Sequence, residues 1–183
     1  FRVCLLILSL SWVSNAFPQD SLNVSLVYHW NDTSLASTFA HNNRYNEVWG
    51  LVEGGREYAV IGSTMGTHIF DITDPSNVDT AVFIPGAATG TSIIHRDFHD
   101  YNGYLYIVCD ENSQVNVSTL QIVDLSYLPD SAPVVYDSDA LFRNSHNIFI
   151  DSASARLYVC GVRPSGNRLE IYSLADPINP VLI

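Results

Sequence analysis

The stretch YAVIGSTMGTHIFDITDP, residues Tyr58–Pro75, predicts two short β-strands joined by a tight turn. Its apolar side chains fall in two runs that are rich in β-branched and aromatic residues, which is typical of strands. Gly66 lies between the runs, where the chain can turn without a steric penalty. Asp74 and Pro75 then close the second run with a turn signal. The stretch therefore indicates a β-hairpin.

The same pattern recurs twice further along the chain. Asp71 and Asp124 hold equivalent positions 53 residues apart, and Ser173 follows Asp124 by 49 residues. A period near 50 residues fits the four-stranded blade of a β-propeller. We therefore predict an all-β fold, a β-propeller fragment of about three four-stranded antiparallel blades. The alternative is a small two-layer sandwich. The copies are YIVC and LQIVDL at residues 106–109 and 120–125, then LYVC and LEIYSLADP at residues 157–160 and 169–177.

Each predicted blade begins with its innermost strand. Natural propellers close with about four to eight blades, so we expect further blades beyond the three seen here. The predicted strands are Glu47–Val52, Glu57–Ser63, His68–Ile72 and Thr80–Ile84 in the first blade, Ile93–His99, Tyr104–Cys109, Thr119–Leu125 and Pro133–Tyr136 in the second, and His146–Ile150, Arg156–Gly161, Arg168–Leu174 and Pro180–Ile183 in the third.

The charge balance narrows the range of partners. Nineteen acidic residues face eight basic ones, all of them Arg, and the net charge is −11. Such a surface repels phosphate, so nucleic acid and anionic lipid are disfavoured as partners. We expect an unknown extracellular protein or a glycan instead, and contact with a membrane only through an anchor outside this sequence.

The first residues read as a targeting segment. Arg2 precedes an apolar run from Val3 to Val13, and small residues follow at Ser14 and Ala16, which suits a signal peptide. About 11 apolar residues are too few to span a bilayer. A buried strand is the alternative. We expect a signal peptide with a truncated start at 1–16, then a segment at 17–44 that contains an N-terminal strand at Val24–Trp30 and a polar linker. Blades follow at 45–183 and are incomplete at the C-terminus.

An extracellular location agrees with three further features of the sequence. Asn23, Asn31 and Asn116 each begin an N-glycosylation triplet. Beyond the leader two cysteines remain, Cys109 and Cys160, each at the end of the second strand of its repeat. Equivalent positions on neighbouring blades lie too far apart for a disulfide, so we predict two buried free thiols, with a bridge as the alternative.

Several motifs together resemble a known family. The segment LQIVD at 120–124 is close to the LVIVD repeat, and NEVWG at 46–50, GREYAVIG at 55–62, GTHIFDITDP at 66–75 and SHNIFID at 145–151 are further matches. In this order they resemble the choice-of-anchor B proteins, which are secreted or surface-tethered β-propellers. The resemblance covers residues 24–183 approximately. It implies an extracellular placement and a binding role, with no established reaction.

The inner strands contain the candidate site residues, because the inner strand of each blade lines the channel of a propeller. Aligning the three strands matches Glu47-Val48-Trp49 with Arg96-Asp97-Phe98 and with His146-Asn147-Ile148. One hypothesis is a channel lip that binds a cation, sugar or peptide. The alternative is that these polar groups hydrogen-bond between blades and lock them together. The channel-lining candidates are Glu47, Trp49, Arg96, Asp97, His146 and Asn147.

Metal sites are not favoured by the spacing. His95, His99 and His146 with Asp97 offer suitable ligand types, but His95 and His99 would lie about 13 Å apart along a strand. We predict no metal site and no cofactor. Calcium is a minor possibility, because Asp71, Asp74, Asp124 and Asp176 fall at strand ends, where carboxylates usually cap turns.

The sequence shows no recognisable catalytic constellation. The segment GSTMG at 62–66 differs from a nucleophile elbow, because Thr64 stands at its centre and a strand follows. We therefore predict a secreted or cell-surface β-propeller that is a binding module and not an enzyme. The alternative is a hydrolase-like propeller enzyme whose central-channel site is completed by further blades, and a structural spacer is a third possibility.

Overall fold

The computed structural model describes residues 23–111, 117–163 and 168–183. The predicted leader at 1–16 and the triplet at Asn116 lie outside the described residues. The triplets at Asn23 and Asn31 are described, and both asparagines are exposed. In the described part of the chain, no helix is long and apolar enough to pass through a membrane.

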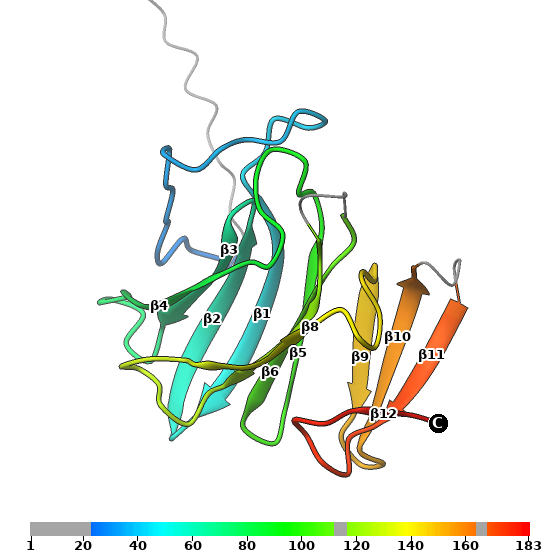
Figure 1. Cartoon of the computed structure of the whole chain (residues 1–183). Coiled ribbons are helices and arrows are strands. Elements are labelled where there is room, and N and C mark those ends of the chain that lie inside the picture. Colours follow the sequence, from blue (N-terminus) through cyan, green and yellow to red (C-terminus); the bar gives the residue numbers. More distant parts are fainter. Residues whose placement is uncertain (1–22, 112–116, 164–167) are drawn as a thin grey trace, which may run out of the picture.

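In the described residues, twelve strands form three separate four-stranded antiparallel sheets, which confirms the predicted blades (Figure 1). In each sheet the strands pair in chain order, from an inner strand to an outer strand. The first sheet contains β1 (Tyr45–Glu53), β2 (Arg56–Ser63), β3 (Gly66–Asp71) and β4 (Asp79–Pro85), the second β5 (Arg96–Tyr101), β6 (Tyr104–Cys109), β7 (Leu120–Asp124) and β8 (Val134–Ser138), and the third β9 (Asn147–Asp151), β10 (Arg156–Val162), β11 (Arg168–Ser173) and β12 (Val181–Leu182).

Local turn chemistry sets the register of the inner hairpins. Gly54 and Gly55 connect β1 to β2 with φ angles of 57° and 78°, and Asn102 and Gly103 connect β5 to β6 with φ angles of 51° and 80°. Two consecutive residues with positive φ form the turn whose twist matches that of a right-handed hairpin, and Gly and Asn adopt it at low cost. The two hairpins therefore hold β1 and β5 in fixed register with their neighbours.

Two apolar cores hold the blades together, one on each side of the second sheet. Leu51, Val60 and Ile69 of the first blade pack with Phe98 and Leu105 of the second. Side chains on the opposite face of the second sheet pack against the third blade. This second core includes Tyr106, Ile122, Ile148, Leu157 and Tyr172. Burial of this apolar surface between sheets is the main source of stability.

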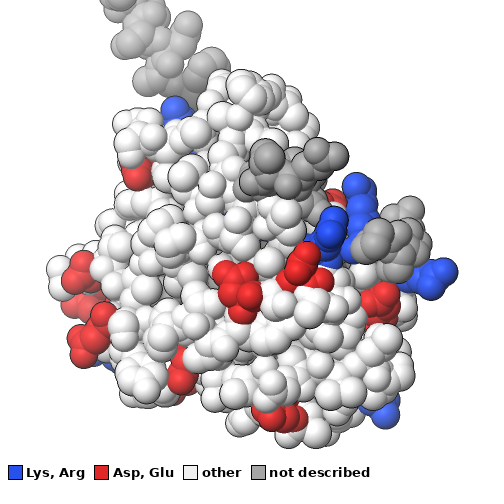
Figure 2. All heavy atoms as spheres, viewed as in Figure 1, with Lys and Arg blue, Asp and Glu red and all other residues white. Residues whose placement is uncertain are grey.

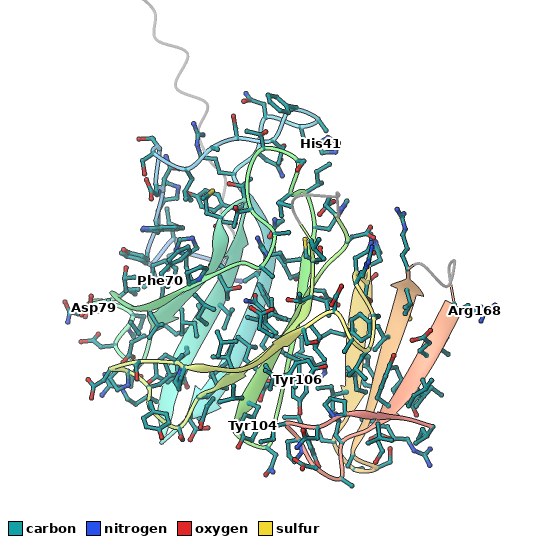
Figure 3. The ribbon with its side chains drawn as sticks, viewed as in Figure 1. His41, Phe70, Asp79, Tyr104, Tyr106 and Arg168 are labelled. Atoms are coloured by element: carbon teal, nitrogen blue, oxygen red, sulfur yellow. The ribbon has the colours of Figure 1, made fainter. Side chains whose placement is uncertain are left out.

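Polar groups reinforce both interfaces between blades. Tyr106 lies between the second and third sheets (Figure 3) and its hydroxyl donates to the carbonyl of Pro177 at 2.7 Å. Between the first and second sheets, the buried Arg96 donates from Nε to the carbonyl of Ser63 at 2.8 Å and from Nη2 to that of Ala88 at 2.7 Å. These bonds satisfy buried groups that would otherwise destabilise the fold.

The segment before the first blade differs from its prediction. Residues 24–30 were predicted as a strand, but they form an extended segment without sheet pairing, and Val24, Leu26 and Val27 are exposed. Only the end of the segment packs onto the blade, through Trp30, whose ring lies 4.9 Å from that of Phe70. Alternation of apolar residues alone does not make a strand, because a strand also needs a neighbour to pair with.

The cysteine prediction is confirmed in one respect and corrected in another. Cys109 and Cys160 are both free. Cys109 is buried as predicted, whereas Cys160 is exposed. The difference arises because β10 belongs to the last blade described, so the face of β10 that bears Cys160 has no further sheet against it.

Candidate functional site

The three inner strands lie next to one another, with β5 between β1 and β9. Their shared edge is the surface that faces the axis of the propeller, and we call it the inner edge. All six of the predicted site residues belong to these strands or immediately precede them. The geometry of the inner edge therefore decides which of them can act together.

Strand register shows which inner-edge positions are equivalent. The repeat positions Asp71, Asp124 and Ser173 each pair with a residue of the second strand in their blade. These partners, which are therefore equivalent, are Tyr58, Tyr104 and Arg156 in the same order. Counting from these pairs makes Trp49, His99 and Phe149 equivalent. The sequence alignment matched Trp49 with Phe98 and Ile148 and is wrong by one residue. A one-residue shift moves a side chain to the other face of its strand.

The three equivalent side chains form a continuous aromatic row across the inner edge. The rings of Trp49 and His99 lie 4.6 Å apart, and those of His99 and Phe149 lie 5.4 Å apart, edge to face. The indole Nε1 of Trp49 donates to Oδ1 of Asp100 at 2.8 Å, which fixes the indole. Phe149 is 59% exposed and lies, with Cys160, on the face of the third sheet that no further described sheet covers.

A polar row accompanies the aromatic row. Asp97 and Asn147 are equivalent residues, each two positions before a member of the aromatic row, and Glu47 precedes Trp49 by the same two positions. Residues two apart in a strand point to the same face, so Asp97 shares the face of His99, and Asn147 that of Phe149. Glu47 lies at an irregularity in β1. Its Oε1 accepts a bond from the backbone amide of Val48 at 2.9 Å.

Asp97 is the most constrained member of the polar row. Its Oδ2 accepts the backbone amide of Ile148 at 2.6 Å and so joins the second blade to the third. Burial raises the pKa of the Asp97 carboxyl, and hydrogen bonds to the backbone amides of Ile148 and Phe98 partly offset this effect. Asp97 thus combines a blade-locking bond with a position beside the aromatic row.

Arg96 does not line the inner edge. Its side chain is 3% exposed and points into the interface between the first two blades. Burial lowers the pKa of the guanidinium. Arg96 therefore locks two blades together, as the second hypothesis for these polar residues predicts, and it does not form part of a channel lip.

His146 lies in a second cluster at one end of the inner strands. His95 precedes β5, His146 precedes β9, and Asp110 and Glu111 follow β6. Since β5 and β6 are antiparallel, these residues meet at the same end. Nδ1 of His95 lies 2.8 Å from Oε1 of Glu111, and Nδ1 of His146 lies 2.7 Å from Oδ2 of Asp110. We call these four residues the histidine cluster.

The histidines group differently from the set considered in the sequence. His95 and His146 come together, with ring centroids 5.1 Å apart, whereas His99 belongs to the aromatic row. Asp110 and Glu111 were not considered. Arg96 pairs with Cys109, so the residues just before Arg96 and just after Cys109 lie side by side. A register assigned from the sequence could therefore have identified Asp110 and Glu111 as neighbours of His95.

The aspartates at strand ends cap turns. Oδ1 of each accepts the backbone amide two residues further on, the usual side-chain turn of Asp. The distances are 3.0 Å for Asp71 and for Asp74, 2.9 Å for Asp124 and 3.2 Å for Asp176. These carboxylates thus have a local structural role.

A surface hollow of about 510 Å³ lies away from the inner edge, beside the outer strands of the first blade. Arg56 and Asp71 line it and bond to each other, with Nε of Arg56 2.6 Å from Oδ2 of Asp71. Their mutual pairing offsets the two charges at the wall of the hollow. Figure 2 shows acidic side chains scattered over one face of the molecule, with Arg side chains gathered toward one side.

No protein-family model matches this sequence, and no curated protein matches it either. Solved structures with a similar fold include a GH43 β-1,3-galactosidase with galactodeoxynojirimycin, at 11% identity and a TM-score of 0.43, covering 75% of this chain and 45% of the other. An exo-β-1,3-galactanase from Clostridium thermocellum has 13% identity and a TM-score of 0.45, with coverages of 75% and 34%. An exo-1,5-α-L-arabinanase from a bovine ruminal metagenomic library has 10% identity and a TM-score of 0.42, with coverages of 78% and 58%.

This chain spans less than two thirds of the length of each of these structures. All three proteins are glycosidases, and this finding contradicts the prediction of a binding module that is not an enzyme. That prediction is therefore withdrawn. The likeness itself concerns the fold. The sequence repeats and the structure therefore agree on three antiparallel blades of a β-propeller.

Proposed function

We propose that this chain is part of a β-propeller hydrolase that acts on a neutral saccharide at the inner edge. One observation carries the proposal: three successive inner strands place Trp49, His99 and Phe149 in a continuous aromatic row beside carboxylates.

The shape and chemistry of the inner edge suit a sugar. The apolar C–H face of a sugar ring packs against aromatic rings, and its hydroxyls need polar partners at the rim. The polar row supplies carboxylates at Glu47 and Asp97 and an amide at Asn147. The net charge of −11 disfavours anionic saccharides, because they would be repelled over the whole approach.

Hydrolysis of a glycosidic bond requires two carboxyl groups on opposite sides of the bond. One protonates the leaving oxygen, and the other activates water or attacks the anomeric carbon. Glu47 and Asp97 are the candidates, because each lies two residues before a member of the aromatic row on adjacent inner strands. Asp100 would act indirectly, by holding the indole of Trp49 in place. A closed propeller would add inner strands from further blades to this site.

The resemblance to choice-of-anchor B proteins and the leader place this activity outside the cell in our proposal. The LVIVD-like segment forms β7, the third strand of its blade, so the repeat coincides with a structural unit. The exposed triplets at Asn23 and Asn31 agree with a secretory route. We propose a glycan, rather than a protein, as the extracellular partner.

The experiment that tests the function is a survey of neutral polysaccharides and oligosaccharides. The protein, with any further blades encoded beside this sequence, is incubated with each, and new reducing ends are quantified. We expect release from at least one substrate and a loss of release in Phe149→Ala. Phe39→Ala is the matched control, because Phe39 is 89% exposed and lies outside the row. Absence of release from every neutral substrate would refute the proposal.

A further inference from the structure

We propose that the histidine cluster, His95, Asp110, Glu111 and His146, binds a divalent transition metal, most favourably Zn²⁺. The site lies at one end of the inner strands and uses none of the residues of the aromatic or polar rows. The inference therefore goes beyond the proposed function, and either can fail without the other.

The ligand types match the metal. Two imidazoles and two carboxylates form a donor set for zinc and for similar first-row ions, whereas calcium prefers oxygen ligands alone. One ligand atom from each of His95, Asp110 and His146 lies within 4.8 Å of the other two. Ligands of a tetrahedral zinc ion lie about 3.4 Å apart, so a shift of about 1 Å per side chain would close the site.

The two rings already stand at a suitable separation. Imidazoles that share one tetrahedral zinc, each with a metal–nitrogen distance of about 2.0 Å, have their centres about 5 Å apart. The rings of His95 and His146 have centroids 5.1 Å apart. Their side chains are 47% and 49% exposed, so the metal has an open approach and the rings have room to turn.

The carboxylates orient the rings as they do in known metal sites. A metal-binding histidine usually donates its second ring N–H to a carboxylate, which fixes the ring and raises its basicity. Glu111 is placed to do this for His95, and Asp110 for His146, at 2.8 Å and 2.7 Å. When an ion enters, one of these carboxylates can shift to it while the other keeps its ring in place.

The backbone around the cluster is firmly held. The amide of His95 donates to Oε2 of Glu111 at 2.9 Å, and the amide of His146 donates to the carbonyl of Cys160 at 2.9 Å. Gly161 has a φ of 71° and lies so close that a Cβ there would be 2.9 Å from Cβ of His146. The sequence thus provides a glycine where the side chain of His146 needs space.

Zinc binding to chelator-treated protein tests the inference, by equilibrium dialysis with metal analysis and by the visible absorption of a Co²⁺ substitute. We expect one equivalent of Zn²⁺ in the native protein and in His41→Ala, an exposed histidine outside the cluster. Affinity should fall at least about tenfold in His95→Ala and in His146→Ala. His95→Gln, which keeps the side-chain volume, should behave like His95→Ala.

Circular dichroism and thermal melting of each variant show whether it is folded. Folded variants that bind Zn²⁺ as tightly as the native protein would overturn the inference. So would a native protein that takes up no Zn²⁺, since the pairs would then be histidine–carboxylate hydrogen bonds alone. Calcium should not compete at concentrations that saturate the site with zinc.

Discussion

The indole of Trp49 donates to the carboxylate of Asp100 across 2.8 Å, and this bond joins the inner strands of the first two blades. It links residues that are 51 positions apart in the chain. The bond holds Trp49 against His99 and so sets the geometry of one half of the aromatic row.

Trp49→Phe should separate the contribution of the indole N–H to stability from the contribution of the aromatic ring to saccharide binding. The variant keeps an aromatic ring but leaves the Asp100 carboxylate without its donor, which should lower the free energy of unfolding by about 1.5–3 kcal/mol. Saccharide affinity should fall less than in Trp49→Ala. Chemical denaturation and titration with an oligosaccharide measure the two effects. Equal affinities in the two variants would show that the ring does not contact the ligand.

Arg96→Ala should destabilise the fold strongly. The change removes two charge-assisted hydrogen bonds and leaves the carbonyls of Ser63 and Ala88 unpaired in the interface. A loss of about 3–5 kcal/mol is expected from the free energy of unfolding. Arg168→Ala is the control, because Arg168 lies exposed at the end of β11 (Figure 3) and should change stability by less than about 0.5 kcal/mol. Similar losses of the free energy of unfolding in Arg96→Ala and Arg168→Ala would contradict the blade-locking role of Arg96.

His68 should make stability depend on pH. Burial lowers the pKa of its imidazole, with a smaller opposing effect from Asp32 and a further lowering by Arg96. Above about pH 6.5 the ring is neutral in both the folded and unfolded chains, so its contribution to stability is complete. As the pH falls below about 6.5 the unfolded chain is protonated first, and stability is lost until the pH passes the folded pKa.

The comparison of native protein with His68→Gln isolates this effect. Gln stays neutral and can still bond to Ser63, whose Oγ lies 2.9 Å from Nε2 of His68. We expect the free energy of unfolding to fall less between about pH 7 and about pH 5 in the variant than in the native protein. The same slope in both proteins would mean that His68 does not contribute.

The two described cysteines should react differently with a thiol reagent. Cys160 is exposed, whereas Cys109 is buried and burial raises the pKa of its thiol. Brief alkylation of the folded 183-residue chain, followed by peptide mapping, should modify Cys160 and leave Cys109 intact, whereas a further blade packed against β10 would protect Cys160 as well. After unfolding, both should be modified. Labelling of Cys109 at the rate of Cys160 in the native state would contradict the described packing.

The repeats made the blades predictable, because each strand pair carries its own turn signals. Gly54-Gly55 and Asn102-Gly103 specify hairpins locally, so the strands and their order follow from short segments. The prediction was wrong at residues 24–30, where apolar residues suggest a strand but the segment pairs with none of the described sheets. Local pattern cannot show whether a strand has a neighbour.

The inner edge was only partly predictable for a related reason. Glu47, Trp49 and Asp97 were identified, but the alignment was one residue out, and it therefore missed His99 and Phe149. The inner hairpins differ in length, since Trp49 precedes Tyr58 by nine residues whereas His99 precedes Tyr104 by five, so a count along the sequence does not give the register. The histidine cluster depends on contacts between blades, which repeat similarity does not report.

The most direct test of the proposed hydrolase is the rate of saccharide cleavage by Glu47→Gln and Asp97→Asn. Both changes keep the shape of the side chain and remove its acid–base chemistry, and the amide oxygen introduced by Asp97→Asn can still accept the bond from the backbone amide of Ile148. We expect each variant to lose at least about 100-fold in rate. Asp79→Asn, on the outer strand β4, should cleave like the native protein. Unchanged rates in both inner-edge variants would contradict the account.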